Sequence, residues 1–186
     1  MKTSDAISGR RSIRRFTDRE VTRAEIESLI DAASLAPNHR LTQPWRFYVL
    51  GPESRAAFGR ALGDRKARKI ADPAAAAAMR ENVANEHRAL PAIIAVAVVD
   101  NENAEIREED YASAMMAVQN IALAATALGL GTHIKTGAVM ADPVARAAMG
   151  VREGERVVAM LNVGVPAEVP PAKPRQPASS FTTWVP

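Results

Sequence analysis

The stretch Ala92-Ile-Ile-Ala-Val-Ala-Val-Val99 decides the fold class of this chain. Eight apolar residues without a polar interruption predict a central strand that is buried on both faces. A second, nearly as apolar run over Arg156–Val163 predicts another buried strand. Since such strands need cover on each side, we expect an α+β domain in which large helices flank a mixed central sheet.

A long, mostly apolar helix is predicted between these strands, over Glu108–Leu130. The acidic residues at its start suit the positive end of the helix dipole, and Gly129-Leu130-Gly131 provides a C-terminal stop. A helix that is hydrophobic nearly all round must be enclosed. In a chain of 186 residues this favours burial at a subunit interface as well as in the core, and therefore an obligate dimer.

Shorter elements complete the domain. Thr22-Arg23-Ala24-Glu25 has the form of a capping box, and the apolar stripe behind it predicts a helix that ends before Pro37. The other predicted elements are a helix over 4–9 capped by Thr3 or Ser4, strands over 46–50 and 132–135, a weakly apolar helical segment over 53–90 in which Asp72-Pro73 is a cap, and a helix from Asp142-Pro143 to about Met149. We expect segment 53–90 to form a variable cover over another part of the molecule, because it lacks large core residues.

Composition limits the remaining possibilities. With 47% hydrophobic residues and no flexible linker, residues 1–186 are expected to form one domain. The absence of cysteine excludes disulfides, thiolate metal sites and a cysteine nucleophile. The polar N-terminus and the lack of a membrane-spanning apolar segment predict a cytoplasmic protein that binds no membrane.

The tail that follows Pro166 is rich in proline and is therefore not expected to form a helix. It ends in Phe181-Thr182-Thr183-Trp184-Val185, whose composition is typical of a strand. An extended segment with residues that are usually buried is expected to pack on a neighbouring subunit, so we predict this for residues 166–186.

Basic residues gather in two places, Gly9-Arg10-Arg11-Ser12-Ile13-Arg14-Arg15-Phe16 and Lys173-Pro174-Arg175. Outside regular structure, guanidinium groups and a hydroxyl can bind a phosphate. A solvated surface with ion pairs is the alternative. Nucleic-acid binding is disfavoured because the net charge is only +3 and no aromatic residues interleave with the arginines.

The loop Pro37-Asn-His-Arg-Leu-Thr-Gln-Pro-Trp45 lies between a predicted helix and a predicted strand. Its two prolines restrict the backbone, and several of its side chains can donate hydrogen bonds. This combination predicts a rigid loop that holds a ligand.

Catalytic side chains are scarce. The three histidines have no metal-ligand spacing, His87 is expected at the surface of a polar helix, and no serine nucleophile motif occurs. Gly129-x-Gly131 follows a helix, so it is a helix terminus rather than a dinucleotide fingerprint. His133-Ile-Lys-Thr-Gly137 offers backbone N–H groups beside a lysine, suitable for a planar, electron-rich ligand. Phosphate binders without catalytic side chains indicate an enzyme whose cofactor carries the reaction.

Four stretches of the sequence then carry a family resemblance. In chain order they are Arg10-Arg11-Ser12-Ile13-Arg14-Arg15-Phe16, Ala36-Pro37…Gln43-Pro44-Trp45, Gln119-Asn120…Gly129-Leu130-Gly131-Thr132, and Lys173-Pro174-Arg175. Together they resemble the FMN-dependent nitroreductase family, in its small, minimal-length branch, over nearly the whole chain. The family implies a nitroreductase-like fold and an intertwined homodimer with two FMN sites at its interface.

The resemblance also implies the cofactor-binding residues. They are Arg10, Arg11, Lys173 and Arg175 around the FMN phosphate, Ser12 and Arg14 at the pyrimidine edge, Asn38 and His39 from the partner chain with Gln43 in the same loop, and Ile134, Lys135, Thr136 and Gly137 along the ring. No side chain is expected to be catalytic: flavin N5 carries the hydride, with the backbone of Thr136 and Gly137 near it. Many members have asparagine where Leu41 stands and a Ser-Ser pair where Asn38-His39 stand.

The activity implied by the family is ping-pong hydride transfer from NADH or NADPH to nitroaromatic, quinone or related acceptors. Two alternatives remain open on the sequence. One is a specialised flavin dehydrogenase of a biosynthetic pathway, and the other is a non-catalytic flavin-binding protein. No metal is expected in any of these.

Overall fold

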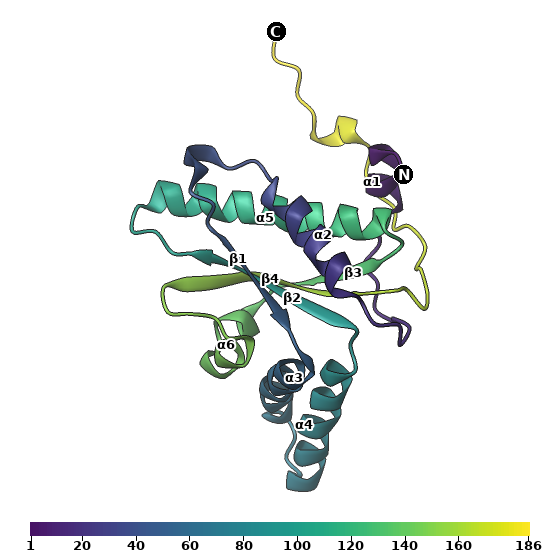
Figure 1. The fold of residues 1–186 in the computed structure, drawn as a ribbon, viewed down its shortest axis with the longest axis vertical. Coiled ribbons are helices and arrows are strands. Elements are labelled where there is room, and N and C mark those ends of the chain that lie inside the picture. Colours follow the sequence, from purple (N-terminus) through teal and green to yellow (C-terminus); the bar gives the residue numbers. More distant parts are fainter.

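The computed structural model describes residues 1–186, which form one four-stranded sheet with helices on both faces (Figure 1). The strands lie in the order β1 (Trp45–Leu50), β2 (Ala92–Val99), β4 (Glu155–Gly164) and β3 (Gly131–Lys135). The predicted strand over Ala92–Val99 is confirmed, and it lies inside the sheet between β1 and β4. Its first seven residues are buried because neighbouring strands and both helical layers enclose them.

The prediction of a mixed sheet is wrong for this chain, because all three strand pairs are antiparallel. Two helices, α3 (Pro52–Ala67) and α4 (Pro73–Arg88), connect β1 to β2. The chain runs away from the sheet along α3 and comes back along α4, so β2 begins at the same end of the sheet where β1 ends. Antiparallel neighbours follow from such a return, whereas a single crossover helix would make them parallel. The one parallel contact is an isolated bridge between Ser12 and Thr132.

One face of the sheet is covered by α5 (Ala104–Ala127) and α2 (Arg23–Ser34). This layer holds the larger core cluster, which includes the fully buried Leu29 and Ile121. The helix α5 begins four residues earlier than predicted, because the Asn103 side chain accepts hydrogen bonds from the backbone N–H of Glu105 and Ile106. An asparagine N-cap therefore overrides the acidic residues that pointed to a start at 108.

The opposite face is covered by the α3–α4 hairpin and by α6 (Pro143–Met149). The two hairpin helices are in close contact at Gly59, where an added Cβ would lie 2.6 Å from the Val83 carbonyl oxygen. The prediction that His87 is at the surface is wrong, since only 6% of it is exposed and its ring packs edge-on against Phe58. The small residues of segment 53–90 thus allow a close helix pair whose core includes this histidine.

The two termini lie on the same side of the molecule (Figure 1). The first helix, α1 (Thr3–Gly9), has Lys2 at its N-cap position rather than Thr3 or Ser4. The tail contains one short turn, η3 (Ala178–Phe181), but no strand, contrary to the composition of its last residues. Trp184 is 90% exposed there. A strand needs a hydrogen-bonding neighbour, and residues 181–186 make no backbone hydrogen bond to another segment of this chain.

Candidate functional site

An open cavity of about 880 Å³ lies between the N-terminal segment, β3 and the tail. Most of its lining residues are basic or polar. The lining residues are Ile7, Ser8, Arg10, Arg11, Ser12, Arg14, Arg15, His133, Ile134, Glu168, Pro170, Ala172, Lys173 and Arg175. We call this the arginine-rich cavity.

Backbone contacts fix the N-terminal side of the cavity against β3. The Ile13 N–H donates to the Thr132 carbonyl at 2.9 Å, and Ser12 forms a parallel bridge with Thr132. Gly131 is required for this approach, since an added Cβ would lie 2.4 Å from Ile13 Cγ1. With Ile13 buried, its neighbours Ser12 and Arg14 are left exposed at the cavity.

The start of the tail is held by the same N-terminal segment. The Thr17 N–H donates to the Val165 carbonyl at 2.9 Å, and the Ala167 N–H donates to the Arg15 carbonyl at 3.0 Å. These two hydrogen bonds place the chain after residue 167 beside the arginine segment. Lys173 and Arg175 consequently reach a cavity whose other cations are more than 150 residues away in sequence.

The charges in the cavity are poorly compensated. Its one ion pair joins Arg15 to Glu168 at 3.7 Å, and both side chains are largely exposed. The Arg11 guanidinium is tied to backbone carbonyls, through Nη1 to the Ser8 oxygen at 2.7 Å and to its neighbour's oxygen at 3.0 Å. The remaining cations, Arg10, Arg14, Lys173 and Arg175, have no carboxylate within 4.0 Å. Such an arrangement favours an anionic ligand.

The structure brings together seven of the predicted site residues in this cavity: Arg10, Arg11, Ser12, Arg14, Ile134, Lys173 and Arg175. Arg15 and His133 also line the cavity; both belong to segments that the sequence predicted to bind a ligand, but neither was among the predicted cofactor-binding residues. The pKa of His133 is lowered, first by burial and then by the nearby Lys135 and Arg14, which favours a neutral imidazole. The position of His133 next to Ile134 in a short strand was the signal that could have found it.

Three predicted ring contacts lie at or beyond the end of β3 and do not line the arginine-rich cavity. Burial lowers the pKa of Lys135, and the positive charge of Lys66 lowers it further. Thr136 and Gly137 are exposed, and Gly137 has φ 121° and ψ −179°, a conformation open essentially only to glycine. Gly137 instead borders a second, smaller hollow.

The predicted ligand loop, Pro37–Trp45, is attached to the first half of α5 by side-chain contacts. The Asn38 amide nitrogen donates to Ser113 Oγ at 3.2 Å, while its carbonyl oxygen accepts from the Gln43 N–H at 2.6 Å. His39 Nδ1 lies 2.8 Å from Glu109 Oε1. Hydrogen bonds from His39 and Arg40 lower the pKa of Glu109, so this carboxylate stays ionised.

These contacts stabilise a strained backbone. Arg40, Leu41 and Gln43 all have positive φ, at 64°, 50° and 45°. Each non-glycine residue in that region costs about 1–3 kcal/mol unless its surroundings impose it. The prediction of a rigid loop is consistent with this geometry, and the rigidity comes from α5 as well as from the two prolines.

Within one chain, the loop and the arginine-rich cavity lie at opposite ends of α5. Ser113, which Asn38 contacts, is 14 residues before the end of the helix at Ala127, or roughly 21 Å along its axis. The structure therefore does not bring Asn38, His39 or Gln43 to Arg10 in the same chain. Leu41 is 80% exposed at the tip of this loop.

No three histidine or acidic side chains lie close enough together to hold a metal ion. No helix has the length and apolar character needed to span a membrane.

Comparison with known proteins identifies the fold family. The model of the Nitroreductase family matches residues 7–165. The chain belongs to the nitroreductase family. It is 33% identical, over 93% of its length and 89% of the relative's, to the Bacillus subtilis protein named "Putative NAD(P)H nitroreductase YfhC".

Solved structures agree with this assignment. The nitroreductase-like family protein from Bacillus cereus superposes with a TM-score of 0.86 at 27% identity, over 100% of this chain and 96% of that one. A Desulfovibrio desulfuricans protein described as a putative nitroreductase in complex with FMN gives a TM-score of 0.74 at 26% identity, over 99% and 96%.

The nitroreductase family match covers only part of the arginine-rich cavity. Arg10, Arg11 and Arg14 lie inside the matched residues, whereas Lys173 and Arg175 lie beyond residue 165. The backbone hydrogen bonds at Val165 and Ala167 hold the start of the tail, and thereby bring Lys173 and Arg175 to the cavity. The composition of the site thus depends both on the residues that match the family and on the tail.

Proposed function

We propose that this nitroreductase family member is an FMN-dependent NAD(P)H oxidoreductase that reduces nitroaromatic, quinone or related acceptors. The observation that carries the proposal is the arginine-rich cavity, in which uncompensated cations from two distant segments converge beside an apolar strand residue. Proteins named as NAD(P)H nitroreductases and a structure containing FMN support the choice of cofactor and reductant.

The residues of the cavity fit FMN. A phosphate dianion needs several hydrogen-bond donors with positive charge, and Arg10, Lys173 and Arg175 supply them without a competing carboxylate. Ser12 and Arg14 supply polar donors suited to the pyrimidine edge of the ring. Ile134 supplies an apolar surface on the neighbouring strand, as a planar ring requires.

When bound, FMN supplies the hydride chemistry, so that reduced nicotinamide and the acceptor react in turn at one site. The chain contributes binding and orientation. The cations hold the phosphate end, Ile134 excludes water from one side of the ring site, and Thr136 and Gly137 present backbone N–H groups at its far end. The neutral His133 adds a polar group without adding to the positive charge.

We further infer that the active form is a homodimer, in which the loop of one chain serves the cavity of the other. Two observations support this. The loop and the cavity are separated within one chain, and Tyr111 and Met116 of α5 are about 40% exposed. The exposed tail, residues 166–186, would pack on the partner and cover Trp184, and residues 53–90 would remain a cover on the outer face of a single domain.

The loop contacts assign different roles to its residues. The Asn38 amide already makes hydrogen bonds to Ser113, Thr42 and Gln43, so its donors and its acceptor are used within its own chain. We therefore propose that Asn38 positions the loop rather than binding FMN. His39, which is 68% exposed in its side chain, is free to approach the partner's cofactor through its other nitrogen.

The test is a flavin spectrum of the purified protein, followed by anaerobic titration with NADH and with NADPH. We expect a yellow protein that releases FMN on denaturation and is bleached by at least one nicotinamide. Turnover with nitro and quinone acceptors should follow. Protein that stays colourless after incubation with FMN would refute the cofactor assignment, and bound FMN without turnover would refute the enzymatic one.

A further inference from the structure

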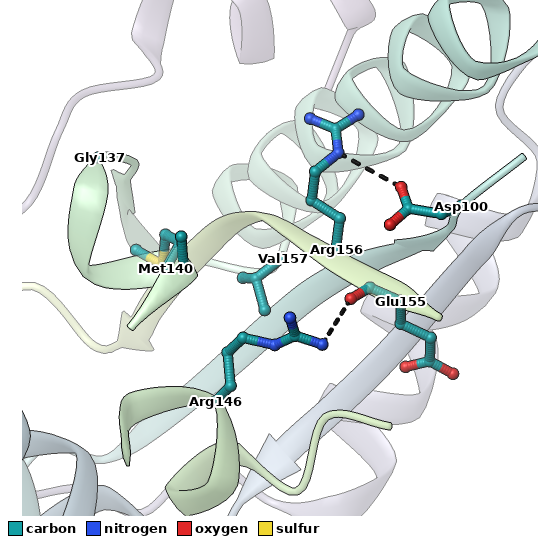
Figure 2. Close-up of a pocket in the computed structure, with 8 residues that line it drawn as sticks. Asp100, Gly137, Met140, Arg146, Glu155, Arg156 and Val157 are labelled. Atoms are coloured by element: carbon teal, nitrogen blue, oxygen red, sulfur yellow. Dashed lines mark hydrogen bonds and ion pairs between the residues drawn. The ribbon is translucent and has the colours of Figure 1, made fainter. Parts of the chain in front are cut away.

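A second hollow of about 290 Å³ lies beside Gly137 (Figure 2). It is formed by the end of β2, the start of β4, α6 and the short turn η2 (Ala138–Ala141). Its lining residues are Asp100, Gly137, Met140, Ala141, Arg146, Glu155, Arg156 and Val157. We call it the Arg146 hollow.

Arg146 is the fixed cation of this hollow. Its Nη2 donates to the carbonyl oxygens of Glu155 at 2.8 Å and Arg152 at 3.1 Å, which holds the guanidinium against the start of β4. No carboxylate lies within 4.0 Å of it. Its Nε and Nη1 groups make no hydrogen bond within the protein, so N–H donors of a fixed, positively charged group remain for a ligand.

The acidic residues of the hollow are engaged elsewhere. The Glu155 carboxylate points away from Arg146 in Figure 2 and accepts a hydrogen bond from the Tyr48 hydroxyl. Asp100 pairs with Arg156 Nε at 3.6 Å, and the Arg156 guanidinium also lies 5.3 Å from the centre of the Tyr111 ring. Arg156 is thus compensated, whereas Arg146 is not.

An apolar wall faces the cation. In Figure 2, Val157 lies between the two arginines and Met140 lies to one side of it, towards Gly137; both are buried. Gly137 leaves its end of the hollow open, because no atom lies within 4 Å of where a Cβ would stand. An apolar wall beside a fixed, positively charged N–H donor matches an aromatic ring that bears a carboxylate.

We propose that the Arg146 hollow binds a small aromatic carboxylate, with the carboxylate on Arg146 and the ring against Met140 and Val157. This site belongs to the chain itself and does not require FMN. Its link to turnover rests on the proposed function: a ligand here would lie beside Gly137, and a carboxylate-bearing acceptor would be preferred over its neutral analogue.

Calorimetric titration of the purified protein with benzoate tests the site directly. We expect saturable binding of benzoate and none of benzamide, which has the same shape without the charge. Because heat is measured and no flavin chemistry is involved, the result stands whether or not the protein is an FMN enzyme. An absence of benzoate binding would overturn the proposal.

Two variants locate the site. Arg146→Gln should raise the benzoate dissociation constant about tenfold or more, since one charge-assisted contact is lost. Because Arg146 also ties α6 to β4, a second variant avoids any risk to folding. Ala141→Glu adds a carboxylate at an exposed residue that lines the hollow, and it should weaken benzoate binding similarly by charge repulsion.

The matched control is Ala138→Glu, an exposed alanine of the same turn that does not line the hollow, and it should leave benzoate binding unchanged. A double variant tests whether benzoate binds in the arginine-rich cavity instead. Arg10→Ala with Arg175→Ala should also bind benzoate as the wild type does. If benzoate affinity fell in that double variant and not in Ala141→Glu, the ligand would belong to the arginine-rich cavity and the proposal would be wrong.

Discussion

Arginines play opposite parts in the α3–α4 hairpin and in the arginine-rich cavity. In the hairpin, Arg60, Arg80 and Arg88 each pair with a carboxylate of the other helix, at 3.3, 2.7 and 2.6 Å. In the cavity, Arg10 and Arg175 converge without any acidic partner. The same residue type is therefore compensated in one region and left uncompensated in the other.

The comparison distinguishes arginines that pair within the fold from arginines that remain available to an anionic ligand. Arginines that face carboxylates across a helix pair are already neutralised, so they offer little attraction to an anion. Arginines that the fold brings together without partners repel one another, and a bound anion relieves that repulsion. Charge compensation, rather than arginine content, distinguishes the two regions.

The largest expected effect is on the cavity. Arg10→Ala combined with Arg175→Ala should raise the FMN dissociation constant about a hundredfold or more, because each charge-assisted phosphate contact contributes roughly 1.5–3 kcal/mol. Riboflavin, which lacks the phosphate, should be bound equally by the variant and the wild type. Fluorescence titration with both flavins measures the difference.

The matched control in the hairpin is Arg60→Ala combined with Arg80→Ala, which also removes two positive charges. FMN affinity should stay within about twofold of the wild type, since exposed ion pairs contribute little and lie outside the cavity. An equal loss of FMN in both double variants would show that general charge, and not the converging cations, attracts the phosphate.

An intermediate effect is expected for Gly59→Ala in the hairpin. The added Cβ would lie 2.6 Å from the Val83 carbonyl oxygen, so the two helices must separate. We expect the free energy of unfolding to fall by about 1–2 kcal/mol, because overpacking outweighs the better helix propensity of alanine. Urea denaturation measures the change.

Gly51→Ala is the control, because the space around Gly51 is open and its φ is −69°. It should change stability by about 0.5 kcal/mol or less. FMN affinity should be unchanged in both glycine variants, as the hairpin does not line the cavity. If the Gly59→Ala variant were fully folded and yet bound FMN more weakly, the hairpin would contribute to the cavity, contrary to the comparison of the two regions.

The smallest effect concerns a compensated arginine outside the hairpin, Arg19, which pairs with Glu25 at 2.7 Å. A hydrogen bond from Arg19, with further contacts from Thr22, lowers the pKa of Glu25 to about 2. Since the folded pKa is below the ordinary value of 4.5, this stabilisation is present above that value and is lost as the pH falls toward about 2.

Glu25→Gln should therefore lower the Tm by about 2 °C at pH 7 and by progressively less below pH 4.5. Thermal unfolding at a series of pH values measures this. The control is Glu27→Gln, which removes a more exposed ion pair of the same helix. Its effect on the Tm should vary less with pH than that of Glu25→Gln. A difference between Glu25→Gln and wild type that grew on acidification would contradict the assigned sign.

Much of the fold could be predicted because it depends on local patterns. The Thr22–Glu25 capping box, the Asp72-Pro73 cap and the apolar run of β2 each act over a few residues, and the structure confirms all three. His87 could not be placed in this way. Its burial depends on Phe58 and on the close approach at Gly59, which no pattern within α4 contains.

The same difference between local patterns and distant contacts applies to the candidate site. The arginine segment and Lys173-Pro174-Arg175 were predicted to bind a phosphate, and the structure places them in one cavity. The hydrogen bond from the Asn38 amide to α5 could not be foreseen, because Ser113 is 75 residues away. Arg146 was missed because a single arginine in a short helix resembles any surface residue until its partners are known.

The sequence by itself determined the buried strands, the caps of α2 and α4, the nitroreductase family and the chemical nature of the cations. Those properties depend on side-chain chemistry and on short-range periodicity. The tertiary structure decided the antiparallel order of the sheet, which cations converge and which arginines find carboxylates. Contacts between distant segments depend on how the backbone brings them together, as Gly131 allows at Ile13, so only the folded chain distinguishes a compensated charge from one that is open to a ligand.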